Sequence, residues 1–238
     1  MSAETTTPYF SAENLMSDWQ QFHLALSLQA ERGSMTCIVG ASGSGKSTAL
    51  RIIAGLQAST AAMHQKTTRI VLAGKDITNE KPGKRNIGMV FQSHALFSHL
   101  SVGDNVGYGL RCAGVSKKEA RKRAAAFLAR FKLAGFEARS VETLSGGEAQ
   151  RVSLARTLIV QPKLVLFDEP LSALDAPLRK RLAAEIRALQ AEIGFTGIMV
   201  THDLAEAKAV GDRIIALRHG TLLWQGSAAD FDEALLEQ

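Results

Sequence analysis

Residues 40–47 restrict the possible folds of this chain more than any other stretch. They read Gly40, Ala41, Ser42, Gly43, Ser44, Gly45, Lys46 and Ser47, which matches the phosphate-loop pattern in full. An apolar run at 35–39 precedes them as a predicted buried strand, and a helix is expected over about 47–56. Glycines let such a backbone curl around an anion, and the following helix adds its positive end. We therefore expect a strand–loop–helix unit that binds phosphate groups, rather than an ordinary Gly/Ser-rich turn.

Two acidic residues, Asp168 and Glu169, follow a wholly apolar run at 164–167. Such a run is typical of a central parallel strand, and the C-terminal ends of these strands border the ligand crevice of an open α/β sheet. We expect Lys46 to reach the β- and γ-phosphates of a nucleotide, and Ser47 with Asp168 to hold Mg²⁺. Glu169 would polarise the water that attacks the γ-phosphate. The alternative is an acidic loop without a catalytic role.

Two further predicted strands also end in polar side chains. Gln92 ends the strand at 86–91, and His202 follows the strand at 198–200. Because the ends of parallel strands meet at one edge of a sheet, we expect both residues near the phosphate site. The carboxamide oxygen of Gln92 can touch Mg²⁺. His202 can hydrogen-bond the γ-phosphate, although a single histidine at a strand end is more often structural.

The stretch between these strands is predicted to be helical over about 95–158. Ser116 and Glu119 form a capping-box pattern before an amphipathic helix at 117–132. A second helix is expected to begin within the segment Ser145, Gly146, Gly147 and Glu148. N–H groups at a helix start attract anions, yet a nucleotide pocket at the phosphate loop does not need this segment. We interpret it as a second anion site, offered to a nucleotide that another molecule holds.

Periodicity and turn residues predict the remaining elements. Strands are expected at 22–28, 69–73, 213–217 and 221–224, a helix at 177–193, a helix capped by Asp203 and Glu206, and a short acidic helix ending at Gln238. Buried apolar strands that alternate with helices indicate an α/β fold.

The composition fits a globular protein. The chain has 238 residues, a formal charge of +5 and 46% hydrophobic residues, which is enough for a buried core. We interpret a basic run at 117–123 as a solvated helix face rather than a nucleic-acid surface. Cys37 and Cys112 make neither a disulfide framework nor a metal site, and this fits a reducing compartment. Residues 1–10 lack a secretory pattern, and no run is long enough to span a membrane, so a cytosolic protein is expected.

The order of these motifs resembles that of an ATP-binding-cassette (ABC) ATPase over nearly the whole chain. The phosphate loop, Gln92, the signature at 144–148, the acidic pair, a D-loop-like segment at 172–175 and His202 occur in family order. The resemblance implies an α/β P-loop NTPase core, a mixed sheet with an N-terminal antiparallel β-subdomain, and a helical subdomain inserted at about 95–158. It also implies ATP and Mg²⁺ as ligands, with Thr48 among the nucleotide contacts. An aromatic residue would stack on adenine, with Trp19 the first candidate and Phe22 the second.

In that family two copies pack head to tail, so Ser145, Gly146, Gly147 and Glu148 would contact the nucleotide on the partner's phosphate loop. The resemblance implies ATP hydrolysis coupled to solute import, by a peripheral subunit at the cytoplasmic face of the cell membrane. Its partners would be a second copy, separate membrane-spanning permease subunits and, indirectly, a solute-binding protein. No nucleic-acid partner is expected. A non-transport ATPase switch is the alternative from a different class.

Features outside the shared motifs concern the cargo. Segments 96–102 and 224–226 are similar to those of the ATPase subunits of thiamine importers, and we predict thiamine as the leading cargo. Importers of ferric iron and polyamines share related segments and stay as alternatives. The extra C-terminal β-domain of many sugar and ion importers is not expected. Segment 59–68 is expected to form an altered loop without effect on catalysis.

Overall fold

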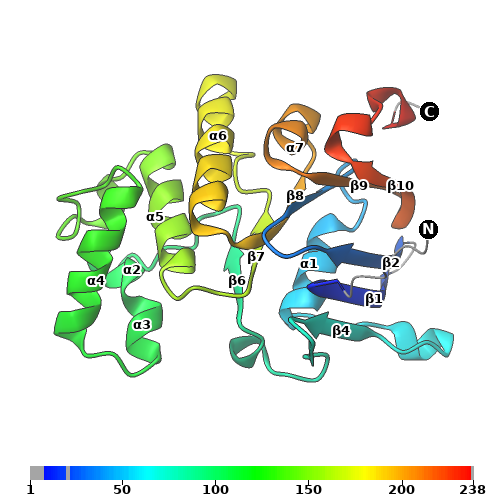
Figure 1. Cartoon of the computed structure of the whole chain (residues 1–238), viewed down its shortest axis with the longest axis horizontal. Helices are drawn as coiled ribbons and strands as arrows, with labels where there is room; N and C mark the ends of the chain where they lie inside the picture. The colour runs from blue at the N-terminus through cyan, green and yellow to red at the C-terminus, as the bar shows by residue number, and fades with distance from the viewer. Residues whose placement is uncertain (1–7, 20–21, 237–238) are drawn as a thin grey trace, which may run out of the picture.

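A mixed sheet forms the centre of the molecule. The computed structural model describes residues 8–19 and 22–236, and within them the sheet has ten strands in the order β5-β4-β1-β2-β10-β9-β3-β8-β7-β6. Helices lie on both faces, and a further group of helices lies beyond the β6 edge (Figure 1). The strands are β1 (Phe10–Trp19), β2 (Phe22–Ala30), β3 (Met35–Val39), β4 (Arg69–Leu72), β5 (Lys75–Asp76), β6 (Ile87–Val90), β7 (Leu164–Asp168), β8 (Thr196–Thr201), β9 (Arg213–Arg218) and β10 (Thr221–Ser227).

The sheet joins a parallel half to an antiparallel half. Strand β3 pairs in parallel with β8 and β9, and β7 pairs in parallel with β8 and β6. Strand β1 pairs antiparallel with β2 and β4. The two halves meet at β10, which is antiparallel to β9 and makes a parallel pair with β2. This arrangement confirms the predicted fold, a mixed sheet with an N-terminal antiparallel part.

Both faces of the parallel half are covered. In β7, Leu164 and Leu166 pack with α1 (Lys46–Ala54), whereas Val165 and Phe167 pack with α6 (Ala176–Ile193) and α7 (Leu204–Val210). This alternation follows from the period of two in a strand. Because both faces are apolar, polar side chains are concentrated at the strand ends, where a ligand can reach them.

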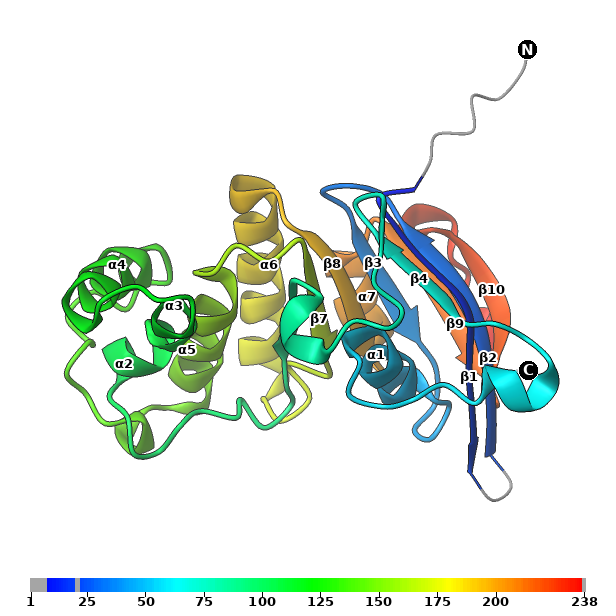
Figure 2. The same ribbon diagram turned by 90° about the horizontal axis from the view of Figure 1, so that it is seen from below.

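The predicted helical stretch contains a group of four helices, beside the sheet in both views (Figures 1 and 2). They are α2 (Val102–Val106), α3 (Tyr108–Cys112), α4 (Lys117–Arg130) and α5 (Gly146–Leu158). The hydroxyl of Ser116 accepts the N–H of Glu119, as expected, but the Glu119 side chain accepts from Arg123 instead of closing a capping box. The subdomain boundary at about 95–158 stays a prediction.

Strand β1 was not predicted, because its sequence lacks a clean alternation. Asn14 has a φ of 51°, and the register with β2 shifts between Ala12 and Leu15, as in a β-bulge. Segment 59–68 contains a short 3₁₀ helix, η1 (Ala61–His64). The last described element is a 3₁₀ helix, Glu233–Leu236, and Gln238, the predicted end of a short acidic helix, lies outside the described residues.

Candidate functional site

The phosphate loop runs from the end of β3 to the start of α1, as the sequence predicts. Gly43 and Gly45 have φ values of 80° and 92°, which a residue with a Cβ rarely adopts. A Cβ added to Gly45 would lie 2.6 Å from Cζ of Phe22, so the loop also needs this glycine for close packing. The conformation of the loop therefore depends on its packing against Phe22 of β2 as well as on its own sequence.

Two polar groups inside this loop fit an anionic ligand. Lys46 is only 4% exposed, and its Nζ donates to the carbonyls of Gly40 at 2.8 Å and Ala41 at 2.9 Å. Burial lowers the pKa of the Lys46 ammonium, and the nearby carboxylates of Glu169 and Asp168 oppose this shift. The buried hydroxyl oxygen of Ser44 has no hydrogen-bond partner among the described residues. A phosphate group would supply an acceptor for both side chains.

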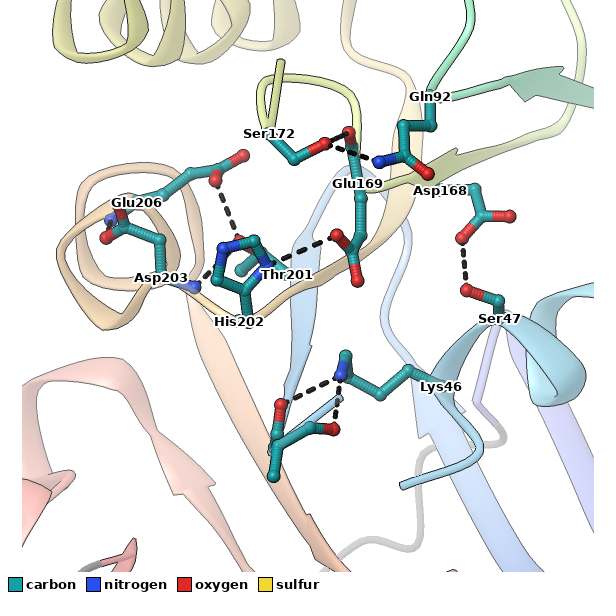
Figure 3. A network of polar contacts seen from close by, with 12 residues as sticks. Lys46, Ser47, Gln92, Asp168, Glu169, Ser172, Thr201, His202, Asp203 and Glu206 are labelled. Carbon is teal, nitrogen blue, oxygen red and sulfur yellow. Dashed lines mark hydrogen bonds and ion pairs between the residues drawn. The ribbon is translucent and has the colours of Figure 1, made fainter. Parts of the chain in front are cut away.

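A hydroxyl and a carboxylate meet at the start of α1. Ser47 Oγ donates to Asp168 Oδ1 at 2.6 Å, and Asp168 is buried at the end of β7 (Figure 3). These oxygen donors are of the kind that Mg²⁺ takes in phosphate sites, usually with few carboxylates. The pair therefore fits a magnesium ion that is bound together with phosphate oxygens.

The ends of β7 and β8 bring Glu169 and His202 together. His202 Nδ1 lies 3.2 Å from Glu169 Oε2, and the backbone N–H of Glu169 donates to Val200 O at 3.1 Å. Glu169 has a φ of 46°, a left-handed conformation that is uncommon for a residue with a side chain and often marks a functional site. The carboxylate and the imidazole are thus held side by side near the phosphate loop (Figure 3).

Gln92 reaches this group of residues through a different partner from the one predicted. Its Nε2 donates to Ser172 Oγ at 3.0 Å, and that hydroxyl donates to the carbonyl of Glu169 at 3.0 Å. Ser172 belongs to the D-loop-like segment that follows β7. The structure therefore links Gln92 to the backbone of Glu169, and contact of Gln92 with Mg²⁺ stays a prediction.

A network behind His202 was missed in the sequence. Arg179 of α6 donates to Asp203 at 2.8 Å and to the carbonyl of Leu174 at 2.9 Å, so it ties the D-loop-like segment to the loop of His202. Thr201 Oγ1 donates to Glu206 at 2.8 Å. Burial raises the pKa of the Glu206 carboxyl to about 7, although the Thr201 hydrogen bond opposes this shift. Only the cap formed by Asp203 and Glu206 was visible in the sequence pattern.

Both aromatic candidates line a cavity of about 740 Å³ that also contains Lys46, Ser47 and Thr48. They differ in exposure. Trp19 is 72% exposed at the end of β1, whereas Phe22 is half-buried against Gly45. Phe22 therefore packs against the loop, whereas most of the Trp19 side chain is exposed.

The signature segment caps α5 with its own side chains. Ser145 and Gly146 are exposed at the start of the helix. The Ser145 hydroxyl accepts from the N–H of Glu148 at 3.4 Å, and the Glu148 carboxylate accepts from the N–H of Ser145 at 2.8 Å. This backbone hydrogen bond lowers the pKa of the Glu148 carboxyl. Helix α5 lies apart from α1, with β7 between them in both views (Figures 1 and 2).

The loop after Gln92 is fastened to α5. The carbonyl of His94 accepts from Ser153 Oγ at 3.1 Å and from Arg156 at 2.9 Å, and the carbonyl of Ala95 accepts from Arg156 at 2.6 Å. His94 Nδ1 also lies 2.7 Å from Gln150 Oε1. Side chains on α5 thus hold the loop that leads away from the phosphate site.

Comparison with known proteins decides the family. A family model described as "ABC transporter" matches residues 24–172, a segment that includes the phosphate loop, the signature and the acidic pair. The chain belongs to the ABC transporter family. The expected resemblance is therefore confirmed at the level of the family.

Curated relatives in this family are named for iron. The chain is 47% identical to the Fe(3+) ions import ATP-binding protein FbpC of Pasteurella multocida, over 86% of this chain and 57% of the relative. It is also 47% identical to FbpC of Brucella abortus, over 88% of this chain and 58% of the relative. The chain thus spans a little over half the length of these curated relatives.

Solved structures of ABC transporter proteins share the fold. The cbiO1 protein of Clostridium perfringens, described as part of the transporter complex cbiONQ, matches with a TM-score of 0.81 and 28% identity, over 94% of this chain and 90% of that one. The ATP-binding cassette MJ1267 in its ADP conformation also gives a TM-score of 0.81, at 25% identity and 98% coverage of both chains. Among the described helices of the present chain, none is long and apolar enough to cross a membrane.

Proposed function

We propose that this chain is the ATP-hydrolysing subunit of an ABC importer and that two copies act together on each ATP. One observation carries the proposal. Lys46, Ser47, Asp168, Glu169 and His202 gather around the phosphate loop, whereas the exposed signature lies at the start of α5, away from that loop. The signature thus needs a nucleotide from a second molecule.

The residues around the phosphate loop divide the work. Lys46 and the N–H groups of the loop would bind the β- and γ-phosphates. Ser47, Asp168 and Gln92 would hold Mg²⁺, which supplies charge neutralisation to the phosphates when bound. Glu169 would orient a water and accept its proton as the water oxygen bonds to the γ-phosphorus and the bond to the bridging oxygen of ADP breaks. The products are ADP and inorganic phosphate.

The remaining site residues would set geometry. His202, held against Glu169, would contact the γ-phosphate. Trp19 would stack on adenine, because its ring is exposed at the mouth of the cavity. Ser145, Gly146 and Gly147 of the second copy would complete the site through the positive end of α5. ATP binding would then close the dimer, and hydrolysis would release it.

Mixing two inactive variants tests the shared site. Ser145→Arg blocks the signature and Lys46→Ala weakens ATP binding at the phosphate loop, so each variant alone is expected to have little activity. A mixed dimer regains one intact site, and an equal mixture should recover up to about a quarter of the wild-type rate, because half of random dimers are mixed. Full activity of Ser145→Arg alone would mean that each chain hydrolyses ATP without a partner's signature.

We further propose that the importer carries ferric ions. The curated relatives named above are Fe(3+) import proteins, and this favours the iron alternative of the sequence analysis and lends the thiamine prediction no support. The subunit would sit on the cytoplasmic face of the membrane, against permease subunits that receive ferric ion from a solute-binding protein. Uptake of labelled iron should fall when the chain is replaced by its Glu169→Gln variant. Loss of labelled thiamine uptake with unchanged iron uptake would overturn this cargo.

A further inference from the structure

Three side chains with metal-binding chemistry converge at the outer end of the antiparallel pair β1 and β2. Asp18 and His23 are directly opposite each other in the register of these strands, so both project to the same face. His64 comes from η1, more than forty residues along the chain. The three are Asp18 from β1, His23 from β2 and His64 from the segment 59–68.

The distances within this group are short. His23 Nδ1 lies 2.5 Å from Asp18 Oδ1, and His64 Nε2 lies 2.8 Å from Asp18 Oδ2. One potential ligand atom from each residue lies within 4.8 Å of the others. Zinc bonds of about 2.0–2.2 Å place tetrahedral ligands roughly 3.4 Å apart, so small side-chain rotations would bring the three atoms to bonding positions. The side chains are 36 to 43% exposed, and an ion can enter from solvent.

We propose that Asp18, His23 and His64 bind a divalent transition-metal ion such as Zn²⁺ or Fe²⁺. Two imidazole nitrogens and one carboxylate oxygen suit these ions, whereas Mg²⁺ prefers oxygen ligands alone. Each neutral imidazole would turn its lone pair to the ion and keep its proton on the other ring nitrogen. Solvent would fill the remaining coordination positions.

A neighbouring hydroxyl is already placed to orient the carboxylate. Thr60 Oγ1 donates to Asp18 Oδ2 at 2.6 Å, which is the kind of outer hydrogen bond that fixes a metal-binding carboxylate. The simpler interpretation is an exposed ion pair in which one carboxylate accepts from two histidines. That interpretation explains the contacts but predicts no affinity for metal, so the two are distinguishable by experiment.

The bound ion would connect three segments of the antiparallel part. It would join β1, β2 and η1 directly beside Trp19, the residue that follows Asp18 in β1. Trp19 and Phe22 are paired in the register of β1 and β2, and both line the cavity of about 740 Å³ beside the phosphate loop. The ion would therefore hold this edge of the cavity in place. This inference does not depend on the proposed hydrolysis or cargo.

Metal titration of the full chain without an affinity tag tests the site. With Zn²⁺ and no nucleotide, the wild type should bind one equivalent of the ion. His64→Asn and His23→Asn should each lower the Zn²⁺ affinity by at least about 100-fold, since even changes outside the metal ligands lower it by 10- to 100-fold. The matched control is His99→Asn, an exposed histidine of the loop before α2, which should bind as the wild type does. Equal binding by all four proteins would overturn the proposal.

Further measurements separate this site from the phosphate site and test the role of Thr60. If the equivalent is instead lost in Asp168→Asn and kept in His64→Asn, the ion belongs to the magnesium position and the proposal fails. Thr60→Val should lower Zn²⁺ affinity by about 10- to 100-fold while leaving the fold intact, since it removes the hydroxyl that donates to Asp18. Zn²⁺ should also raise the melting temperature of the wild type and of His99→Asn, but not that of His64→Asn.

Discussion

The phosphate loop and the signature both present N–H groups at the start of a helix, yet the two regions are built in opposite ways. The N-cap of α1 is Gly45, which is in a left-handed conformation and makes no side-chain cap hydrogen bond. The N-cap of α5 is Ser145, whose hydroxyl joins Glu148 in a complete capping box. One helix start leaves its donors to a ligand, whereas the other supplies acceptors from its own sequence.

This difference between the two helix starts indicates that the phosphate loop binds a nucleotide more strongly than the signature does. At the phosphate loop, Lys46 and Ser44 are buried and suited to phosphate oxygens, so most of the affinity for a nucleotide should reside there. At the signature, the exposed donors share their helix start with the Glu148 carboxylate. An anion is therefore expected to gain little there by itself, and in the proposed dimer the signature would contact a phosphate that a second molecule delivers.

The largest effect is expected from Glu169→Gln. The variant keeps the size and polarity of the side chain but cannot accept a proton, so ATP hydrolysis should fall by about 10²- to 10⁴-fold. ATP binding should stay close to wild type, because Lys46 and the loop are unchanged. Steady-state phosphate release and nucleotide binding measure the two quantities, and near-normal turnover would remove Glu169 from its proposed role.

The pH dependence of stability should differ between variants of Glu206, near the phosphate site, and Glu148, at the signature. Glu206 has its pKa raised by burial to about 7, so its stabilising effect is complete below the unfolded pKa near 4.5 and is lost as pH rises through 7. Glu206→Gln should therefore match the wild type near pH 5 and exceed its free energy of unfolding at pH 8, by up to about 3 kcal/mol. Urea unfolding at both pH values measures this.

Glu148→Gln is the contrasting variant at the signature. The pKa of Glu148 is lowered by the Ser145 N–H, so its stabilising effect is present above the unfolded pKa and is lost as pH falls. Glu148→Gln should thus be less stable than the wild type at neutral pH and approach it in acid. The same pH trend in both variants would contradict the assigned environments.

Lys46→Ala tests where nucleotide affinity resides. Loss of hydrogen bonds from a charged group costs about 1.5–3 kcal/mol, which corresponds to about 10- to 100-fold weaker ATP binding. Lys122→Ala removes the same charge from an exposed position in α4 and should bind ATP normally. Isothermal titration with ATP measures the affinity of both variants. Unchanged affinity in Lys46→Ala would place the affinity elsewhere.

The smallest effects compare one glycine from each region. Gly45→Ala forces a methyl group against Phe22 at a φ of 92° and should cost about 1–3 kcal/mol of stability. The Cβ of Gly147→Ala would meet Leu178 at 3.4 Å, an ordinary contact inside a helix, and the change should stabilise the chain by up to about 1 kcal/mol. Denaturant unfolding measures the free energy of unfolding of both variants. A change of the same sign in both would contradict the predicted difference between the two glycines.

Local patterns were sufficient for most elements of the parallel half. The strands predicted at 35–39 and 164–167 and the helix predicted at 177–193 follow from apolar runs and from Pro177, whereas the N-cap role of Asp175 was not identified. The pairing of these strands is not encoded in any one segment, but their buried character on both faces implies a central position. The bulged strand β1 was not predicted, because Asn14 interrupts its alternation of apolar and polar residues.

The candidate site was predictable only where a motif carries its own chemistry. Lys46, Asp168 and Glu169 belong to such motifs. Arg179 was not identified, because nothing in its helix indicates that it would reach both Asp203 and Leu174. The group around Asp18 was missed for a related reason, since Asp18 and His23 meet only through the register of β1 and β2 and His64 comes from η1.

The fastening of the Gln92 loop to α5 has a mechanical consequence. Three side chains on successive turns of α5 make hydrogen bonds to His94 and Ala95. They are Gln150, Ser153 and Arg156. Through these contacts, a shift of Gln92 that changes its hydrogen bond to Ser172 would be passed on to α5. In the proposed dimer, movement of α5 would carry the signature at its start, which the second copy would contact.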